Sequence, residues 1–539
     1  MSNIGLIEAG IARRPSRPHK ACAFVLVWLC LGTVAWGGEN QYQRAQKELA
    51  AGNFTRAEEI YRELINRKPK DVNAYLGLSL LLLKQRNLQS AYDEANKVLA
   101  LEPRNARAHA LAATALLRSG YFLRAIEHLR VALLVDGRED LALVSAAEID
   151  LYESRVEQAF QRLRAAVREQ PDEPDYWLVY ARAASRLEQF KEAANALSQF
   201  LRYAPKTDNE RRARIQGVIK FYNYLDSTNI YELKGEKNAA IPLEIRSRRP
   251  YLQVRINGKE TLRFVIDTGS GITVLSAQAA QRLGVREVAR GGNAHAVGGE
   301  GSFPIVYGVV DRLDLGGIRV ETVPVYIREI HVAPNAVSED IADGYLGLAV
   351  LSNFLITLDY KAGEMRLDVL PEEKAVDIPT PTNALQTVVP FRTTESGLIS
   401  VETRLDEEET LNFIFDSGAS ISVISAAVIE EKKWQSKILS TQTKVVGAAG
   451  ITNDVKLMRA GKLRIADLVR ENLRIAVLNL NRLNEHAGFE QQGILGGDFL
   501  NHCRIQIDFR RLRLVLTPYE SGVLKRVSEV IRSQAEGVK

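Results

Sequence analysis

The sequence predicts a multidomain chain in which an all-α solenoid of helical repeats precedes two all-β lobes. Two observations predict this fold class. Alanines recur at even intervals through the first half of the chain, and a block of β-forming sequence in the second half occurs twice. At 539 residues the chain is also too long for a single hydrophobic core.

The composition is that of a folded protein without an electrostatic pattern for nucleic acid. Apolar residues make up 46% of the chain and charged residues 25%. The formal net charge is +5, of which +3 lies in residues 1–37, so the remainder carries +2. Binding to nucleic acid would need a clustered basic face, and we expect none.

Residues 1–37 have the order of an export signal peptide. Basic residues up to Lys20 precede the uncharged run Ala21–Trp36, and the small residues Ala35 and Gly37 stand where a signal peptidase would cleave. An uncleaved membrane anchor is the alternative, but the run is shorter than the roughly 20 residues that span a bilayer. We expect cleavage and a mature chain in a bacterial periplasm, with secretion or membrane anchoring as alternatives.

Cysteine and histidine give no sign of a disulfide or a metal. Cys22 and Cys30 lie in the expected signal peptide, which leaves Cys503 alone in the mature chain. The strand-like run NHCRIQIDF around Cys503 favours a buried structural thiol over a nucleophile. The seven histidines lack metal-ligand spacing, so we expect neither a metal nor a cofactor.

The first half of the chain repeats one unit at a constant period. Each recurring alanine has an apolar residue three positions before it, and a proline follows each unit except one, where Gly137 stands instead. Small residues mark the first helix of four units. The alanines are 57, 91, 125, 159 and 193, the apolar residues 54, 88, 122, 156 and 190, the prolines 69, 103, 171 and 205, and the small residues 45, 79, 113 and 181.

This unit resembles the tetratricopeptide repeat (TPR), which has a period of about 34 residues and in which two antiparallel helices cross closely at small residues. The resemblance implies a solenoid over residues 38–225, made of five repeats and a capping helix in TDNERRARIQGVIKFYNYL. It also implies a groove that binds a protein partner. A plain helical bundle is the alternative, but accidental spacing would not keep two residue types in phase across five units.

The second half is a duplication. FVIDTGSGITVLS, residues 264–276, returns as FIFDSGASISVIS at 413–425, and the same offset carries GYLGLAVL at 344–351 onto GILGGDFL at 493–500. An offset held along the whole unit indicates one ancestral segment used twice. Both copies contain short runs rich in β-branched residues bounded by Gly, Asn, Asp or Pro, so each is predicted to be an all-β lobe.

The all-β unit, its Asp-Thr/Ser-Gly turn and its later apolar-Leu-Gly motif resemble the retropepsin-like aspartic peptidases. Two lobes fused in one chain, with a pseudo-twofold acid-protease fold, are typical of the pepsin-like enzymes. The resemblance covers roughly residues 241–519. It implies lobe 1 at 241–371 and lobe 2 at 389–519. The charged stretch YELKGEKNAA and the proline-containing stretch LPEEKAVDIPTPTNA predict linkers at 226–240 and 372–388, and the amphipathic pattern after Pro518 predicts a C-terminal helix or tail at 520–539.

The resemblance also implies that Asp267 and Asp416 form a catalytic dyad. Each lobe supplies one aspartate, and two carboxyl groups a few Å apart can share one proton and activate water. The resemblance implies that Ser270 donates a hydrogen bond to the outer oxygen of Asp267. Ala419, at the equivalent position of lobe 2, cannot do the same for Asp416. Six further residues have implied supporting roles. Thr268 and Ser417 would cross-bond beneath the dyad, Gly269 and Gly418 would permit the turns, and Gly347 and Gly496 would let a strand pass close behind.

The flaps are a further expectation from the family. The glycine-rich segments 290–303 and 445–453 occupy matching positions, where the family places a β-hairpin over the substrate. Neither segment contains the tyrosine that pepsin-like enzymes carry on the flap, which favours two retropepsin-like flaps. A plain surface hairpin is the alternative for each segment.

These patterns predict an exported aspartic endopeptidase that cleaves protein or peptide substrates and whose solenoid recruits protein substrates or a partner. A catalytically inactive pseudo-peptidase that serves as a TPR binding scaffold is the alternative, and a third possibility pairs the lobes between chains. Because the solenoid has its own predicted cap and a charged linker follows, we expect residues 230–520 to fold without the repeats.

Overall fold

The structure is a computed structural model that describes residues 40–295, 297–299, 302–331, 341–370, 386–406, 410–447, 450–519 and 523–526. The expected signal peptide lies outside these residues, as do most of the expected linker at 372–388 and most of the segment 520–539. The described residues from Gln41 onward belong to one compact unit. Among the helices of this part of the chain, none combines the length and apolar character needed to cross a membrane.

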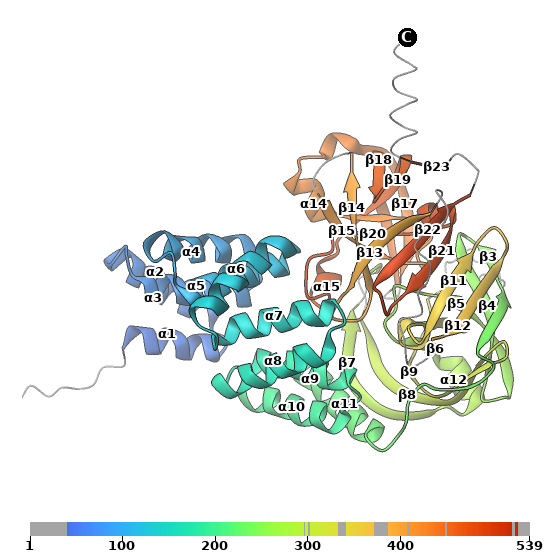
Figure 1. The fold of residues 1–539 in the computed structure, drawn as a ribbon, viewed down its shortest axis with the longest axis horizontal. Helices are drawn as coiled ribbons and strands as arrows, with labels where there is room; N and C mark the ends of the chain where they lie inside the picture. The colour runs from blue at the N-terminus through green and yellow to red at the C-terminus, as the bar shows by residue number, and fades with distance from the viewer. Residues whose placement is uncertain are drawn as a thin grey trace, which may run out of the picture. The chain divides into compact units, whose positions relative to one another are not determined.

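The first half is a solenoid of paired helices (Figure 1). The second helix of every pair begins at the apolar residue of its repeat, from Phe54 to Phe190, and the recurring alanines are fully buried where the helices cross. The helices are α1 Gln41–Ala50, α2 Phe54–Arg67, α3 Val72–Lys84, α4 Leu88–Leu101, α5 Ala106–Arg118, α6 Phe122–Val135, α7 Asp140–Tyr152, α8 Val156–Glu169, α9 Pro174–Arg186, α10 Phe190–Tyr203 and α11 Asn209–Leu225.

Lobe 1 is built around a sheet with the order β1-β9-β6-β10-β5-β4-β8-β7, to which β3 adds beside β4. Its elements are β1 Glu232–Gly235, β2 Asn238–Pro242, β3 Glu244–Arg246, β4 Arg249–Ile256, β5 Glu260–Ile266, β6 Thr273–Ser276, α12 Ala277–Leu283, β7 Arg286–His295, β8 Ser302–Leu315, β9 Ile318–Arg328, β10 Gly344–Leu346, α13 Leu348–Leu351, β11 Phe354–Asp359 and β12 Glu364–Val369.

Lobe 2 repeats this plan, and its strands run on into a sheet shared with lobe 1, in the order β17-β18-β19-β16-β20-β15-β14-β13-β22-β21-β11-β12-β2. Its elements are β13 Thr387–Thr393, β14 Ile399–Leu405, β15 Thr410–Phe415, β16 Val423–Ser425, α14 Ala426–Glu431, β17 Ile438–Gly447, β18 Gly450–Ile465, β19 Leu468–Leu478, α15 Asn481–Asn484, β20 Gly493–Leu495, α16 Gly497–Leu500, β21 Cys503–Asp508, β22 Arg513–Pro518 and β23 Leu524–Arg526.

Two segments differ from the sequence-based expectation. The segment 226–240, expected to be a linker, contains strand β1, which pairs with β9, and most of β2, which pairs with β12. Both strands are short, and charged or small residues dominate them, so the sequence reads like a linker although the backbone completes sheet edges. In the C-terminal segment, Leu524–Arg526 is a strand on β19 and not the expected helix, and Leu524 is buried.

The two lobes are joined within one chain by an antiparallel pair of strands, β11 and β21. Thr357 pairs with Gln506, which is the residue at the equivalent position of the second copy. The pseudo-twofold axis that relates the lobes therefore passes between these two residues. This pairing favours an intramolecular arrangement of the lobes over pairing between chains.

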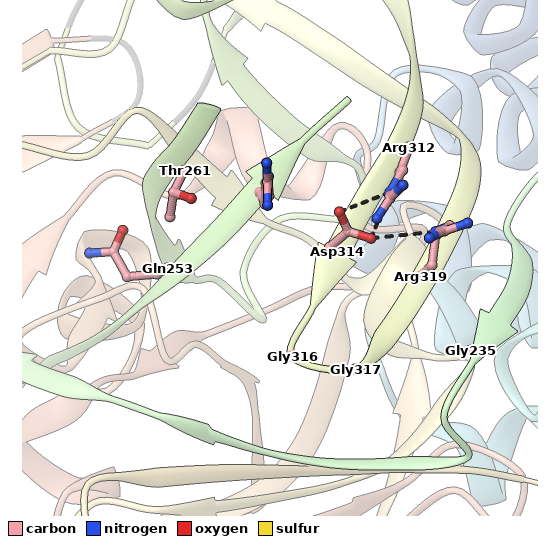
Figure 2. A pocket seen from close by; sticks show the side chains of 9 residues that line it. Gly235, Gln253, Thr261, Arg312, Asp314, Gly316, Gly317 and Arg319 are labelled. Carbon is pink, nitrogen blue, oxygen red and sulfur yellow. Dashed lines mark hydrogen bonds and ion pairs between the residues drawn. The ribbon is translucent and has the colours of Figure 1, made fainter. Parts of the chain in front are cut away.

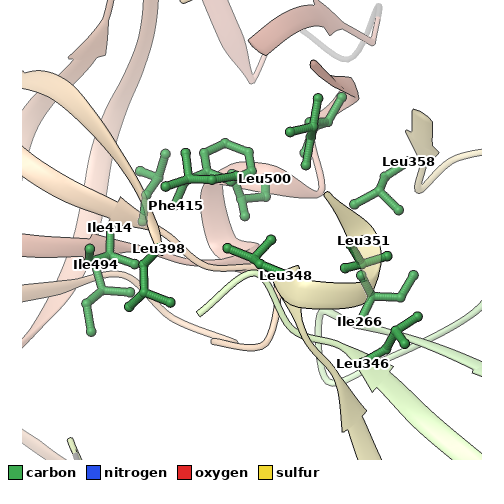
Figure 3. Close-up of a cluster of buried hydrophobic side chains, with 14 of the residues drawn as sticks. Ile266, Leu346, Leu348, Leu351, Leu358, Leu398, Ile414, Phe415, Ile494 and Leu500 are labelled. Carbon is green, nitrogen blue, oxygen red and sulfur yellow. The ribbon is translucent and has the colours of Figure 1, made fainter. Parts of the chain in front are cut away.

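Apolar side chains from both lobes form one continuous core. Figure 3 shows part of it, with Ile266 and Leu346 of lobe 1 and Ile414 and Phe415 of lobe 2 contributing to the same cluster. Ile266 and Phe415 are the last residues of β5 and β15, directly before Asp267 and Asp416. The core thus fixes the ends of the two strands that carry the aspartates.

The solenoid packs against lobe 2 through buried side chains. Phe489 is fully buried, and its ring lies 4.8 Å from that of Phe122 and 5.1 Å from that of Tyr152. Beside it, the amide of Glu490 donates to the carbonyl of Arg118 at 2.8 Å. The expectation that residues 230–520 fold without the repeats does not fit this interface, because loss of the solenoid would expose the Phe489 ring to water.

Candidate active site

Two equivalent turns bring Asp267 and Asp416 to the ends of β5 and β15. In each lobe a parallel strand runs beside the aspartate strand, β10 in lobe 1 and β20 in lobe 2. The amide of Asp267 donates to the carbonyl of Leu346 at 3.1 Å, and that of Asp416 to Leu495 at 3.0 Å. The backbone of both aspartates is therefore fixed by the neighbouring strand.

The turns are locked to each other by Thr268 and Ser417, which are both fully buried. The Thr268 hydroxyl donates to the carbonyl of Phe415 at 2.7 Å, and the Ser417 hydroxyl donates to that of Ile266 at 2.7 Å. Each hydroxyl also accepts from the main-chain amide of the other residue, at 2.9 Å for Ser417 N and 3.2 Å for Thr268 N. Four hydrogen bonds thus cross the interface between the lobes directly beneath the aspartates.

The carboxyl groups of Asp267 and Asp416 lie close enough for the charge of Asp416 to raise the pKa of Asp267. The turn glycines leave the space for this contact. A Cβ atom on Gly269 would lie 2.5 Å from the Cγ atom of Asp416, and one on Gly418 would lie 2.6 Å from Oδ1 of Asp267. Any side chain at either glycine would displace the opposite carboxyl group.

The environments of the two carboxyl groups differ. Burial raises the pKa of Asp267 well above its usual range, and the neighbouring charge of Asp416 raises it further. Burial also raises the pKa of Asp416, but the amides of Gly418 and Ala419 donate to its Oδ1 at 2.8 and 3.2 Å and oppose the rise. The neighbouring charge of Asp416 thus adds to the rise in the pKa of Asp267, whereas backbone donors oppose the rise in the pKa of Asp416.

Ser270 does not have the expected hydrogen bond. Its hydroxyl donates to the carbonyl of Ile272 at 2.8 Å, so its single proton is not available to the outer oxygen of Asp267. The asymmetry between the two carboxyl groups comes instead from the backbone, because Asp267 accepts from the amide of Gly269 at 2.9 Å whereas Asp416 accepts from the amides of Gly418 and Ala419.

Gly347 and Gly496 lie where the chain passes close behind each aspartate turn. A Cβ atom on Gly347 would lie 2.6 Å from the carbonyl of Ile272, and one on Gly496 would lie 2.7 Å from that of Ile421. The amide after Gly347, that of Leu348, donates to the carbonyl of Ser270 at 2.8 Å. The glycines thus allow the backbone contacts that support both turns.

Sequence reasoning missed Asp498, which supports the turn of lobe 2. The side chain is 5% exposed, and its Oδ1 accepts from the amide of Ser422 at 2.9 Å and from the Ser422 hydroxyl at 2.6 Å. Lobe 1 has Ala349 at the equivalent position. The difference between GLAV and GGDF in the duplicated motif is the signal in the sequence that marks this residue.

The two glycine-rich segments are hairpins whose described tips touch. The amide of Gly299, between β7 and β8, donates to the hydroxyl of Thr452 on β18 at 2.7 Å. A Cβ atom on Gly298 would lie 2.7 Å from the Cα atom of Gly447. We call β7–β8 flap 1 and β17–β18 flap 2.

Two other features do not contribute to a reaction centre. Cys503 is fully buried, and burial raises the pKa of its thiol to about 12, as expected for a structural thiol. A cavity of about 300 Å³ lies on lobe 1 around Gly316 and Gly317 (Figure 2). The guanidinium groups that line it are already engaged, since Arg312 and Arg319 lie 2.8 and 3.6 Å from Asp314 and Arg255 donates to the carbonyl of Gly258.

Comparison with known protein families gives matches in both halves of the chain. The family model described as aspartyl protease matches the chain twice, at residues 252–350 and 401–499, and the model described as tetratricopeptide repeat matches residues 48–115. The search of the curated proteins finds no match.

The solved structures that match the chain include TPR proteins. One is a thermophilic TPR protein of Thermus thermophilus (18% identity, 34% of this chain and 96% of that chain, TM-score 0.28). A second is a TPR protein of Parabacteroides merdae (14% identity, 34% and 72%, TM-score 0.26). PilF of Pseudomonas aeruginosa gives 18% identity over 34% of this chain and 83% of that chain, with a TM-score of 0.26. The family matches therefore fall on both parts of the fold, with the tetratricopeptide-repeat model on the helical solenoid and the aspartyl protease model once on each β-rich lobe.

Proposed function

We propose that the chain is an exported aspartic endopeptidase that hydrolyses peptide bonds through the Asp267/Asp416 dyad. The observation that carries this proposal is the close approach of two half-buried carboxyl groups, one from each lobe, on turns locked by Thr268 and Ser417. Two like-charged groups this close cannot both ionise, so the pair holds one proton and one negative charge at mildly acidic pH.

The asymmetry of the dyad assigns a role to each carboxyl group. Asp416, which accepts two amide hydrogen bonds, takes a proton from water, while protonated Asp267 donates to the substrate carbonyl oxygen. The water oxygen bonds to the carbonyl carbon and gives a tetrahedral intermediate. Asp416 then passes its proton to the amide nitrogen, the C–N bond breaks, and Asp267 recovers its proton as the new carboxylic acid forms.

A cleavage assay tests the activity. The purified mature protein is incubated with a mixed peptide library between about pH 3 and 8, with and without an inhibitor that mimics the tetrahedral intermediate. We expect cleavage on the acid side of neutrality that the inhibitor blocks. Absence of cleavage across this range would favour the inactive scaffold, in which protein binding by the solenoid is the function.

The solenoid has the proposed role of recruiting protein substrates or a partner, in keeping with its repeat family. Lobe 2 already contacts α5, α7 and α9 through the bonds of Arg118, Thr393 and Arg186, so recruitment would use the earlier repeats. A chain that lacks the first repeat, residues 38–71, should cleave short peptides at the normal rate but protein substrates more slowly. An equal loss for both substrates would argue against recruitment.

Export is the remaining part of the proposal and is supported by the order of basic, apolar and small residues in 1–37. N-terminal sequencing of the native protein should find a mature chain that begins near Gly38. A native protein that begins at Met1 or Ser2 would contradict cleavage of the signal peptide.

A further inference from the structure

The last helix of the solenoid, α11, lies directly on flap 1. Gly217 occupies the interior of α11, where glycine is less favourable than alanine, and it is buried. A Cβ atom at this position would lie 2.2 Å from the Cα atom of Gly291 and 2.6 Å from the carbonyl oxygen of Arg290, both on β7. The backbone of the helix and that of the flap strand therefore touch, with no room for a methyl group.

The flap strand is shaped to accept this helix. The pairing of β7 with β8 shifts in register between Arg290 and Asn293, and Gly292 within this bulge has a φ of +63°. A Cβ atom on Gly291 would lie 3.2 Å from the carbonyl oxygen of Arg214 on α11. The contact thus requires glycine at position 217, and a Cβ atom at position 291 would also be tight against α11.

Aromatic packing extends the contact to the second strand of flap 1. Phe221, one turn after Gly217 on α11, stacks on Tyr307 of β8 with ring centroids 4.5 Å apart and planes at 24°. Both rings are buried, in a cluster that also contains Leu225 and Ala289. The helix therefore contacts both strands of the hairpin.

The first strands of the two flaps differ in how far they are buried. None of the ten residues of β17, the first strand of flap 2, is buried, whereas Ala289 and Gly291 of β7 are buried beneath the solenoid contact. The described tips of the two hairpins touch through Gly299 and Thr452. One flap is thus held by the solenoid, and the other reaches it from an exposed strand.

We propose that α11 is the positioning element of flap 1, and that Gly217 and Phe221 hold this hairpin in place over the two aspartates. The inference rests on the proposed function for its link to catalysis, but the positioning itself does not require activity. It gives the solenoid a role inside the peptidase unit in addition to recruitment.

The test compares Gly217→Ala with wild type by hydrogen exchange and by peptide kinetics. Alanine favours the helix itself, so any loss comes from the contact with flap 1. We expect amides of residues 286–295 to exchange about tenfold faster, while those of 438–447 are unchanged. The peptide KM should rise about tenfold with a smaller change in kcat, because a displaced flap 1 binds substrate less well.

Two further variants keep the test decisive. Gly137→Ala is the matched control, because a Cβ atom there meets only the carbonyl oxygen of Leu133, at 3.8 Å, and no change is expected. Phe221→Leu removes the stacking on Tyr307 without adding atoms, and it should also accelerate exchange in 286–295.

Unchanged exchange in this segment for both Gly217→Ala and Phe221→Leu, or an equal rise in both flaps, would overturn the inference. A wild type that cleaves no peptide would overturn the proposed function, and the exchange comparison would still test the positioning.

Discussion

The main-chain amide of Ser417 donates a hydrogen bond to the hydroxyl of Thr268 at 2.9 Å, and the main-chain amide of Thr268 donates one to the hydroxyl of Ser417 at 3.2 Å. This exchange joins equivalent residues of the two copies of the duplicated unit. Because both side chains are fully buried, water does not compete for these bonds. The relative position of the two aspartate turns therefore depends on this pair.

Substitution of Ser417 by alanine tests that dependence. Ser417→Ala leaves the amide of Thr268 and the carbonyl of Ile266 without their side-chain partner in a buried site, which should cost about 1–3 kcal/mol of unfolding free energy. Ser417→Thr is the matched control, because lobe 1 carries threonine at the same position. Chemical unfolding measures both, and equal stability of Ser417→Ala and wild type would contradict the account of the lock.

The buried ring of Phe489 predicts that solenoid and lobes are stable only together. Phe489→Ala in the full chain should lower the unfolding free energy by about 3–5 kcal/mol, because it leaves a cavity between Phe122 and Tyr152. A chain that begins near residue 226 should aggregate or unfold, since it exposes the same ring. Soluble monomeric lobes with an unchanged melting temperature would contradict this prediction.

The raised pKa of Asp267 predicts a pH-dependent effect of Asp267→Asn on stability. Because burial raises the pKa of this carboxyl group in the folded protein, its contribution to stability is fully present below the unfolded-state pKa of about 3.9 and is lost as the pH rises through the folded-state pKa. An amide does not titrate. The unfolding free energy of Asp267→Asn, relative to that of wild type, should therefore be higher at pH 8 than at pH 3 by about 1 kcal/mol or more.

Thermal unfolding at the two pH values measures this difference. The asparagine side chain of the variant keeps an oxygen that can accept from the amide of Gly269, so the turn itself should be retained. A stability difference between variant and wild type that is the same at pH 3 and pH 8 would show that Asp267 does not carry a shifted proton.

Much of the fold could be predicted because the signals repeat. The even spacing of the alanines predicts the helix pairs, and the constant offset between the two copies predicts the two lobes with their equivalent turns at Asp267 and Asp416. Family resemblance adds the lock between Thr268 and Ser417, which depends on contacts between the copies that no local pattern specifies.

The rest depends on contacts that leave little mark in the sequence. The strands β1 and β2 are short edge strands whose charged residues are typical of a linker, and their pairing partners lie far along the chain. Phe489 stands in a loop and is buried by another domain. Gly217, unusual in a helix interior, is a local signal of the contact between α11 and flap 1. The sequence alone does not show that Gly291 is the residue it contacts.

The measurement that tests the central claim most directly is peptide cleavage by Asp267→Asn and Asp416→Asn beside wild type. An amide can neither take the proton from water nor complete the shared-proton pair, so each variant should lower kcat/KM about a thousandfold or more while the fold is retained. Wild type should show a bell-shaped pH profile with its maximum on the acid side of neutrality. If one variant keeps full activity, the two aspartates do not form one site, and if both match wild type in a reaction that an aspartic-peptidase inhibitor does not block, the dyad is not catalytic.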